Sequence, residues 1–188
     1  MEIQTLYIVE GYKFNDFGNA YKFEIFIKDK NFTDYELRIL AEAFKQNLTI
    51  KDEEKITKIA PDGSKMKLVL KGINEGLNVE LYNNPELSLE QMALIYDALK
   101  QNLDVKTFNS PEFTFAQMKA IIYGLINKLD VTAYANPKYN FEQMKELIDG
   151  LEKGLNIHIL QNEKLTANEM KQIKKRLILM KNRIKSNK

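Results

Sequence analysis

The sequence has no cysteine and no tryptophan, and its only histidine is His158. Without cysteine the chain cannot form a disulfide, a thiolate zinc site, an iron–sulfur cluster or a cysteine nucleophile. A single histidine also excludes a multi-histidine metal site, and no Ser/His/Asp order or glycine-rich phosphate loop is present. We therefore expect a protein that is not an enzyme and that holds neither a cofactor nor a metal.

Long apolar runs are also missing. The longest strongly apolar run covers residues 177–180, far too short to span a membrane. Residues 1–10 carry Glu2 and Glu10 and no basic segment, so they do not resemble a signal peptide. These features predict a cytoplasmic protein without a membrane partner.

The charge is unevenly distributed along the 188 residues. Residues 164–188 contain nine Lys or Arg and one acid, Glu169, whereas residues 1–163 carry a net charge of −6. A basic terminus after an acidic body indicates either a solvated terminal helix or a surface for an acidic partner or a nucleic acid.

The strongest signal is an internal repeat of 26 residues. Four ungapped copies occupy residues 77–102, 103–128, 129–154 and 155–180, and two degenerate copies precede them at 22–47 and 48–76. Each copy has an anchor residue followed by apolar residues three and seven positions later, a spacing that lies on one face of a helix. The anchors are Leu37, Met66, Met92, Met118, Met144 and Met170, and we expect them in the core.

Capping residues mark both ends of the predicted helices. In every copy except the second, a capping box precedes the anchor: Thr33 with Glu36, Ser88 with Gln91, Thr114 with Gln117, Asn140 with Gln143, and Thr166 with Glu169. Residues that tolerate a left-handed turn end four of the helices, namely Asn47, Gly76, Asn102 and Gly154. Lys128 is the exception.

The segment between successive helices leaves two interpretations open. Asn or Asp begins it in most copies, and Pro85, Pro111 or Pro137 ends it in three, which favours a short helical turn. A strand would instead make a leucine-rich-repeat-like α/β solenoid. We favour a mainly α fold, a short α-solenoid of about six repeats.

Residues 1–30 differ from the repeats. Segments 1–11 and 21–29 are rich in β-branched and aromatic residues, and the residues between them include Asn15, Asp16 and Gly18. This pattern predicts an N-terminal β-hairpin cap over residues 1–30, with a small ligand-binding β-domain as the alternative. The helical repeat array would then occupy 31–163 and a basic capping helix 164–188.

Two positions within the repeat support a C-terminal cap. Gly72, Gly124 and Gly150 share one helical position, and glycine there predicts that a neighbouring helix packs closely. In the last copy this position is Arg176, and a nearby apolar position becomes Lys174. We expect both cations to be exposed because no further repeat follows.

The third full copy resembles a known tandem repeat. It contains Tyr134-Ala135-Asn136-Pro137, Tyr139, Phe141-Glu142-Gln143-Met144, Gly150-Leu151 and Gly154-Leu155. This is similar to repeats of the form YAxPxFxxxQMxxIxxGLxxGLDV, found in uncharacterised proteins of low-GC bacteria and their mobile elements. The resemblance covers residues 77–160 well and implies a repeat scaffold in a phage or mobile-element setting. It supplies no catalytic residues.

Cations recur directly after the anchors and in the terminal helix. They could bind a protein or follow a phosphate backbone, although Lys145 could instead pair with Asp149 and Arg38 with Glu42. Tyr123 is the clearest aromatic residue beside this row. The candidate binding residues are Lys67, Lys119, Lys145, Lys171, Lys174, Lys175, Arg176, Lys181 and Arg183. His158 occupies a variable position and is expected to be solvent-exposed.

These features predict a non-enzymatic protein-interaction repeat module. The resemblance motivates a narrower hypothesis, a phage or mobile-element inhibitor of a host defence nuclease, of the anti-CRISPR kind. The alternative is a nucleic-acid-binding protein that uses the lysine row and the basic C-terminal helix. A homodimer through that helix is a third hypothesis, because apolar residues recur there at coiled-coil spacing: Met170, Ile173, Leu177, Met180 and Ile184.

Overall fold

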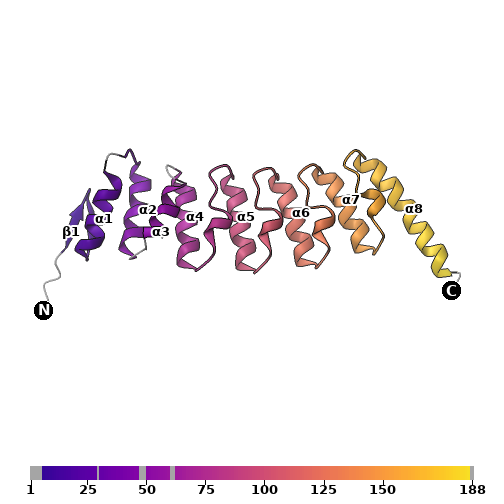
Figure 1. The fold of residues 1–188 in the computed structure, drawn as a ribbon, viewed down its shortest axis with the longest axis horizontal. Helices are drawn as coiled ribbons and strands as arrows, with labels where there is room; N and C mark the ends of the chain where they lie inside the picture. Colours follow the sequence, from indigo (N-terminus) through magenta and orange to yellow (C-terminus); the bar gives the residue numbers. More distant parts are fainter. Residues whose placement is uncertain (1–5, 29, 47–49, 60–61, 187–188) are drawn as a thin grey trace. The chain divides into compact units, whose positions relative to one another are not determined.

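A computed structural model describes residues 6–28, 30–46, 50–59 and 62–186. Over these residues the chain is mainly helical, with a two-stranded hairpin near its N-terminus, and both features confirm the sequence prediction. The chain forms two compact units, Met1–Met92 and Ala93–Lys188. The boundary between the units falls within helix α5 (Leu89–Lys100) (Figure 1).

The hairpin is smaller than predicted, and a helix follows it. Strands β1 (Tyr7–Val9) and β2 (Tyr12–Phe14) pair antiparallel around a turn in which Glu10 and Gly11 have positive φ. Helix α1 (Phe17–Ile27) is capped by the preceding residue, Asp16, whose side chain accepts a hydrogen bond from the Asn19 amide at 2.8 Å. The predicted second strand at 21–29 was therefore wrong. Burial of Ala20 and Phe23 at helical spacing outweighs the β-propensity of the individual residues.

The first unit also contains three further helices and a 3-10 turn: α2 (Asp34–Lys45), α3 (Ile50–Thr57), α4 (Gly63–Asn74) and η1 (Val79–Leu81). Its core is partly aromatic: the ring centroid of Phe23 lies 5.2 Å from that of Phe14 and 5.7 Å from that of Phe44. The sequence offered no capping box for α4, and Asp62 caps it instead by accepting from the Lys65 amide at 3.0 Å.

In the second unit, long helices alternate with single 3-10 turns. The helices are α6 (Phe115–Ile126), α7 (Phe141–Glu152) and α8 (Ala167–Ser186). The turns are η2 (Val105–Thr107), η3 (Val131–Ala133) and η4 (His158–Leu160). The connecting segments are thus helical turns and not strands. Met118, Met144 and Met170 are fully buried, as predicted for these anchors, whereas the anchor Leu37 of the first unit is only partly buried.

The helix ends follow the sequence signals closely. The predicted capping boxes are present, for example in α7, where Asn140 and Gln143 cap each other. Gly76, Asn102 and Gly154 adopt a left-handed conformation, and Lys128 does so too, with φ 56°. The Leu129 amide donates to the Gly124 carbonyl at 2.9 Å, which closes this helix end without a glycine. Asn47 lies outside the described residues.

Candidate interaction surface

Polar residues that recur in the repeat hold successive elements together. In α6, the side chain of Gln117 accepts from the Thr114 amide at 2.6 Å and donates to the carbonyls of Pro137, at 3.0 Å, and Tyr139, at 2.5 Å. Gln143 makes the same contacts one repeat later, to the carbonyls of Glu163 and Leu165. These capping-box glutamines therefore fasten each helix to the loop that follows it by 20 to 22 residues.

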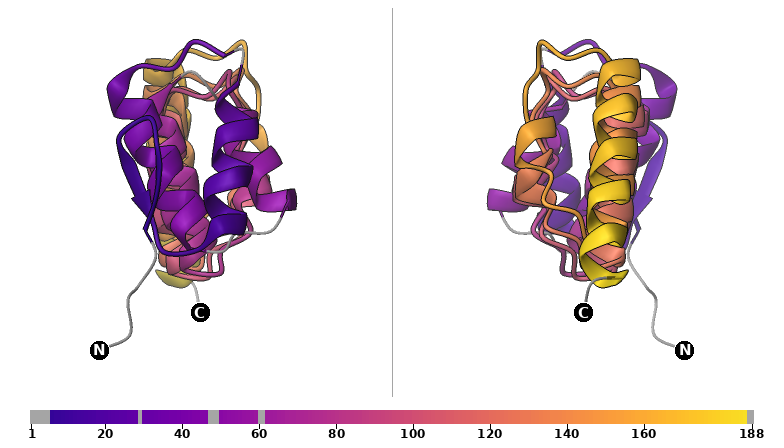
Figure 2. Two further views of the ribbon diagram at one scale, coloured as in Figure 1. Left: turned by 90° about the vertical axis from the view of Figure 1, so that its left-hand side faces the viewer. Right: turned by 90° about the vertical axis from the view of Figure 1, so that its right-hand side faces the viewer.

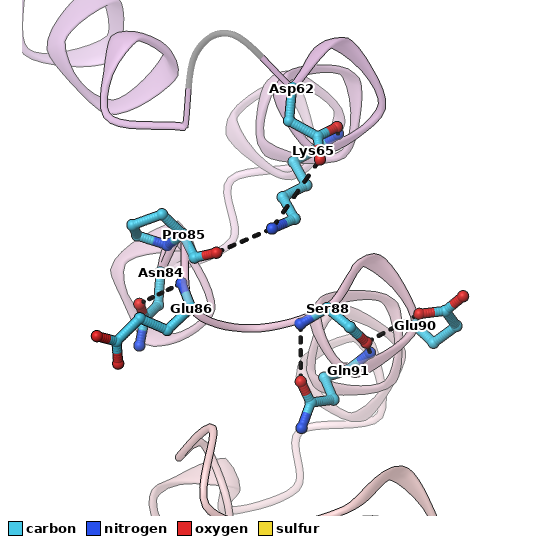
Figure 3. A network of polar contacts seen from close by, with 8 residues as sticks. All are labelled: Asp62, Lys65, Asn84, Pro85, Glu86, Ser88, Glu90 and Gln91. Carbon is cyan, nitrogen blue, oxygen red and sulfur yellow. Dashed lines mark hydrogen bonds and ion pairs between the residues drawn. The ribbon is translucent and has the colours of Figure 1, made fainter.

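The first unit contains a related contact. Lys65 occupies the position equivalent to Gln117, and its ammonium group donates to the carbonyl of Pro85 at 2.9 Å. Figure 3 shows this bond beside the reciprocal bonds of Ser88 with Gln91, which form the capping box of α5. Lys65, Gln117 and Gln143 thus have a structural role, since their donors are used inside the fold.

Two glycines at the shared position of the repeat, Gly72 and Gly124, face a tyrosine hydroxyl. A Cβ atom placed on Gly72 would overlap the hydroxyl of Tyr82, and one on Gly124 would overlap that of Tyr134. We predicted close packing there by a neighbouring helix; the neighbour is instead the tyrosine after the next short turn. Burial, together with the charge of Glu152, raises the pKa of Tyr134 far above its ordinary value, so its hydroxyl stays protonated and acts as a donor.

Five side chains on α6 and α7 form an exposed surface, which we call the aromatic–lysine face: Phe115, Lys119, Tyr123, Phe141 and Lys145. The Lys119 ammonium lies 5.6 Å from the ring centroid of Phe115, and the Lys145 ammonium lies 5.4 Å from that of Phe141. The two phenylalanines are the first residues of their helices and lie one repeat apart. Sequence reasoning missed them, although a phenylalanine four residues before each lysine was a readable signal.

Tyr123 joins the two helices across this face. Its hydroxyl donates to Glu152 on α7 at 2.5 Å, and this hydrogen bond to a carboxylate raises the pKa of Tyr123. Glu142 also lies on α7 and pairs with Lys145 at 3.0 Å. The face therefore mixes aromatic rings, cations and carboxylates and has no single sign of charge.

Most of the nine predicted cations are exposed. Lys67 lies on α4 of the first unit, and the others are on α6, α7 and α8 of the second. The exposed cations of the second unit are Lys119, Lys145, Lys171, Lys175, Arg176 and Arg183. These residues could contact a partner directly.

The prediction that Lys174 is exposed was wrong, because only 7% of its surface is exposed. Its ammonium group contacts Glu146 at 2.5 Å and Asp149 on α7. Burial lowers the pKa of Lys174, but the hydrogen bonds with these two carboxylates raise it more, so the net shift is upward. Lys174 therefore ties α8 to α7 and is unavailable to a partner.

Lys181 is also used inside the fold. Its ammonium group donates to the carbonyls of Lys153 at 2.7 Å and Gly154 at 2.8 Å, where α7 ends. A cation at this position satisfies carbonyl groups that have no partner within the helix. Like Lys174, it has a structural role.

Two predicted ion pairs and the predicted dimer seam also differ from the structure. Asp149 pairs with Lys153 and Lys174 rather than with Lys145, and Glu42 pairs with Lys45 at 2.9 Å. Met170, the first residue of the seam, is fully buried in the chain's own core, so the complete apolar series is not available to a second copy. The side chain of Ile184 lies outside the described residues. His158 is exposed, as predicted.

Within the described ranges, no three His, Asp or Glu side chains are grouped as ligands for a metal ion. None of the described helices combines the length and apolar character needed to cross a bilayer.

The chain matches no protein-family model, and neither a curated protein nor a solved structure matches it. Its function is therefore inferred from the surfaces described above.

Proposed function

We propose that this chain is a non-enzymatic protein-interaction module, a short solenoid of 26-residue repeats that binds a protein through its aromatic–lysine face. The observation that carries the proposal is the exposure of Phe115 (44%) and Phe141 (38%) at one repeat position. Exposed aromatic residues grouped on one surface are typical of protein-binding sites, where they act as anchors.

The recurring internal contacts support the repeat architecture. The hydrogen bonds from a capping-box glutamine to the following loop, which we call the glutamine clasp, recur at the 26-residue spacing. The left-handed helix ends recur at the same spacing, and the anchor methionines are buried in the core. In a solenoid, the outward residues of each repeat can vary without disturbing such contacts. The aromatic–lysine face uses only outward positions, which suits a surface adapted to one partner.

Binding of single-stranded nucleic acid is the second candidate. Aromatic rings beside cations can stack bases and neutralise phosphates, and Phe115 with Lys119 and Phe141 with Lys145 supply both groups. Glu142 and Glu152 lie on the same face and would repel phosphates. The mixed charge therefore favours a protein.

Affinity capture with matched variants tests the proposal. Three baits would be used in lysate of a low-GC bacterium, each with and without nuclease treatment: the full chain, the double variant Phe115→Ser/Phe141→Ser and the control Ile25→Ser. Ile25 is an exposed apolar residue of the first unit. We expect the chain and the control to retain the same protein and the double variant to lose it. Equal capture by all three would contradict the proposal, and capture that disappears on nuclease treatment would favour the nucleic-acid alternative.

The resemblance to mobile-element repeats motivates a narrower proposal for the partner, a host defence nuclease in the cytoplasm. A retained nuclease would be assayed for DNA cleavage with and without the chain. Inhibition by the chain and not by the double variant would support this partner, and unchanged cleavage would reject it.

A further inference from the structure

The outer side of α8 and the adjoining turn η4 carry a second exposed surface, separate from the aromatic–lysine face. We call it the terminal face and define it by Ile159, Arg176, Leu179, Met180 and Arg183. Ile159, Leu179 and Met180 are 60%, 62% and 61% exposed. In the right-hand view of Figure 2, α8 lies in front of α7 and no other element is drawn in front of α8. A hollow lined by Asn156, His158, Ile159 and Leu177 adjoins this face.

The terminal face is closed to a further repeat of the same kind. In α7, the absence of a side chain at Gly150 allows Ile157, in the segment after the helix, to pack closely: a Cβ atom on Gly150 would lie 2.7 Å from the Ile157 Cγ2 atom. In α8 the equivalent residue is Arg176, whose side chain would occupy this space. Glu169 likewise replaces the clasping glutamine, and a carboxylate has no N–H group to donate to a following loop.

Charge also disfavours a second copy of this helix. Arg176 and Arg183 are exposed and lie two helical turns apart, between Leu179 on one side and Met180 on the other. Residues 164–188 carry a net charge of +8. Two α8 helices in contact would bring these cations together, which is costly where apolar contact excludes water.

We propose that the terminal face binds an acidic amphipathic helix of another protein. The apolar side of that helix would cover Ile159, Leu179 and Met180, and its flanking Asp or Glu residues would pair with Arg176 and Arg183. An apolar patch with a cation one helical turn before it and another one turn after it selects an amphipathic helix of the opposite charge. This inference does not depend on the aromatic–lysine face, because the two surfaces share no residue.

A labelled peptide tests the inference. The probe is a designed helix of about 18 residues, or five turns, with leucines at positions i, i+3, i+4 and i+7 and glutamates elsewhere. Two comparison peptides carry lysine for glutamate or serine for leucine. Fluorescence anisotropy with the full chain should show saturable binding of the acidic peptide alone, and this binding should weaken as salt rises.

Variants of the chain identify the surface. Leu179→Ser/Met180→Ser and Arg176→Ser/Arg183→Ser should each weaken binding by about tenfold or more, whereas the control Phe115→Ser/Phe141→Ser should bind normally. Reversal of both arginines, Arg176→Glu/Arg183→Glu, should transfer the preference to the lysine peptide, a gain that misfolding cannot produce. Unchanged binding by the first two variants would overturn the proposal.

The comparison probes provide the other contrary results. Equal binding of the acidic and lysine peptides would contradict recognition by charge. Vesicles of phosphatidylglycerol test a lipid surface as the occupant, and binding of the chain to these vesicles without binding to the acidic peptide would overturn the proposal in favour of a membrane.

Discussion

The hydroxyl of Tyr134 occupies the space in which a side chain on Gly124 would begin, and it donates a hydrogen bond to the Ala120 carbonyl at 3.2 Å. Tyr82 makes the same contact with the Leu68 carbonyl beside Gly72. In the intervening repeat the two positions are Ala98 and Phe108. Alanine thus replaces glycine in the repeat where phenylalanine, which has no hydroxyl, replaces tyrosine. Glycine with tyrosine and alanine with phenylalanine are thus matched pairs.

The variant Gly124→Ala should lower the free energy of unfolding by about 2 kcal/mol, because the added methyl group displaces the Tyr134 hydroxyl. Adding Tyr134→Phe should recover most of this loss, since it reproduces the natural pair Ala98 and Phe108. Urea unfolding of both single variants and the double variant gives the coupling energy. Additive effects of the two substitutions would show that the residues are not matched.

The variant Gln143→Glu should destabilise the fold by about 3 kcal/mol, because it removes two hydrogen bonds and sets a carboxylate against the carbonyls of Glu163 and Leu165. Glu169→Gln is the matched control. It makes the opposite change at the equivalent position of α8, where the Glu169 carboxylate accepts from the Thr166 amide in the same capping box, and it should alter stability by less than about 0.5 kcal/mol. Similar effects of the two variants, measured by urea unfolding, would argue against the clasp.

The contact of Lys174 with Asp149 should make stability depend on pH. Burial raises the pKa of Asp149, but its hydrogen bonds with Lys153 and Lys174 lower it more, so the net shift is downward. A carboxyl with a lowered pKa in the folded state stabilises it above the unfolded pKa of about 4 and loses this contribution as the pH falls. The free energy of unfolding, measured at several pH values, should therefore decrease as the pH is lowered below about 4.

A lysine variant isolates this effect. Lys174→Ile removes one of the two lysines bonded to Asp149, while Lys153 and Glu146 remain, and it should reduce the acid-dependent loss of stability. Lys171→Ile, at an exposed position three residues earlier, serves as the control and should leave the loss unchanged. An equal acid dependence in wild type and Lys174→Ile would contradict the assigned contact.

The variant Lys128→Gly should raise the free energy of unfolding by about 0.5–1 kcal/mol, because Lys128 has φ 56° and glycine adopts this conformation with little strain. Gly154→Ala is the reverse change at the equivalent position of the next repeat and should lower stability by a similar amount. Thermal unfolding of both variants checks the prediction. If Lys128→Gly lowered the free energy of unfolding instead, the Lys128 side chain would stabilise the fold by more than the strain of its left-handed backbone destabilises it.

Local sequence signals predicted much of the fold. The pairing of Asn140 with Gln143 and the left-handed turn at Gly154 depend on residues close in sequence, and the structure confirms both. The secondary structure of residues 21–29 was harder to predict, because the β-propensity of the aromatic residues competes with the helical spacing of Ala20 and Phe23. There, the tertiary burial of one helical face decided the outcome.

Contacts between repeats were less predictable. Glycine at position 124 indicated close packing but not the identity of its neighbour, which depends on the path of the next turn. Lys174 was expected to be exposed because no further repeat was expected to cover it. Its partners, Glu146 and Asp149, lie 28 and 25 residues earlier, so a single helix could not reveal them. Phe115 and Phe141 could have been recognised by comparing first-turn positions between repeats.

The repeat architecture is tested most directly by inserting a second copy of residues 129–154 directly after Gly154. The new copy would meet Gly150 with a tyrosine equivalent to Tyr134, and its own final residues would meet α8 as they do now. The 26-residue register predicts a folded chain whose cooperative urea unfolding has a larger m-value and more helical signal than wild type. An insertion of residues 129–148 alone, which breaks the register, should disrupt folding. Equal disruption by both insertions would contradict the repeat architecture.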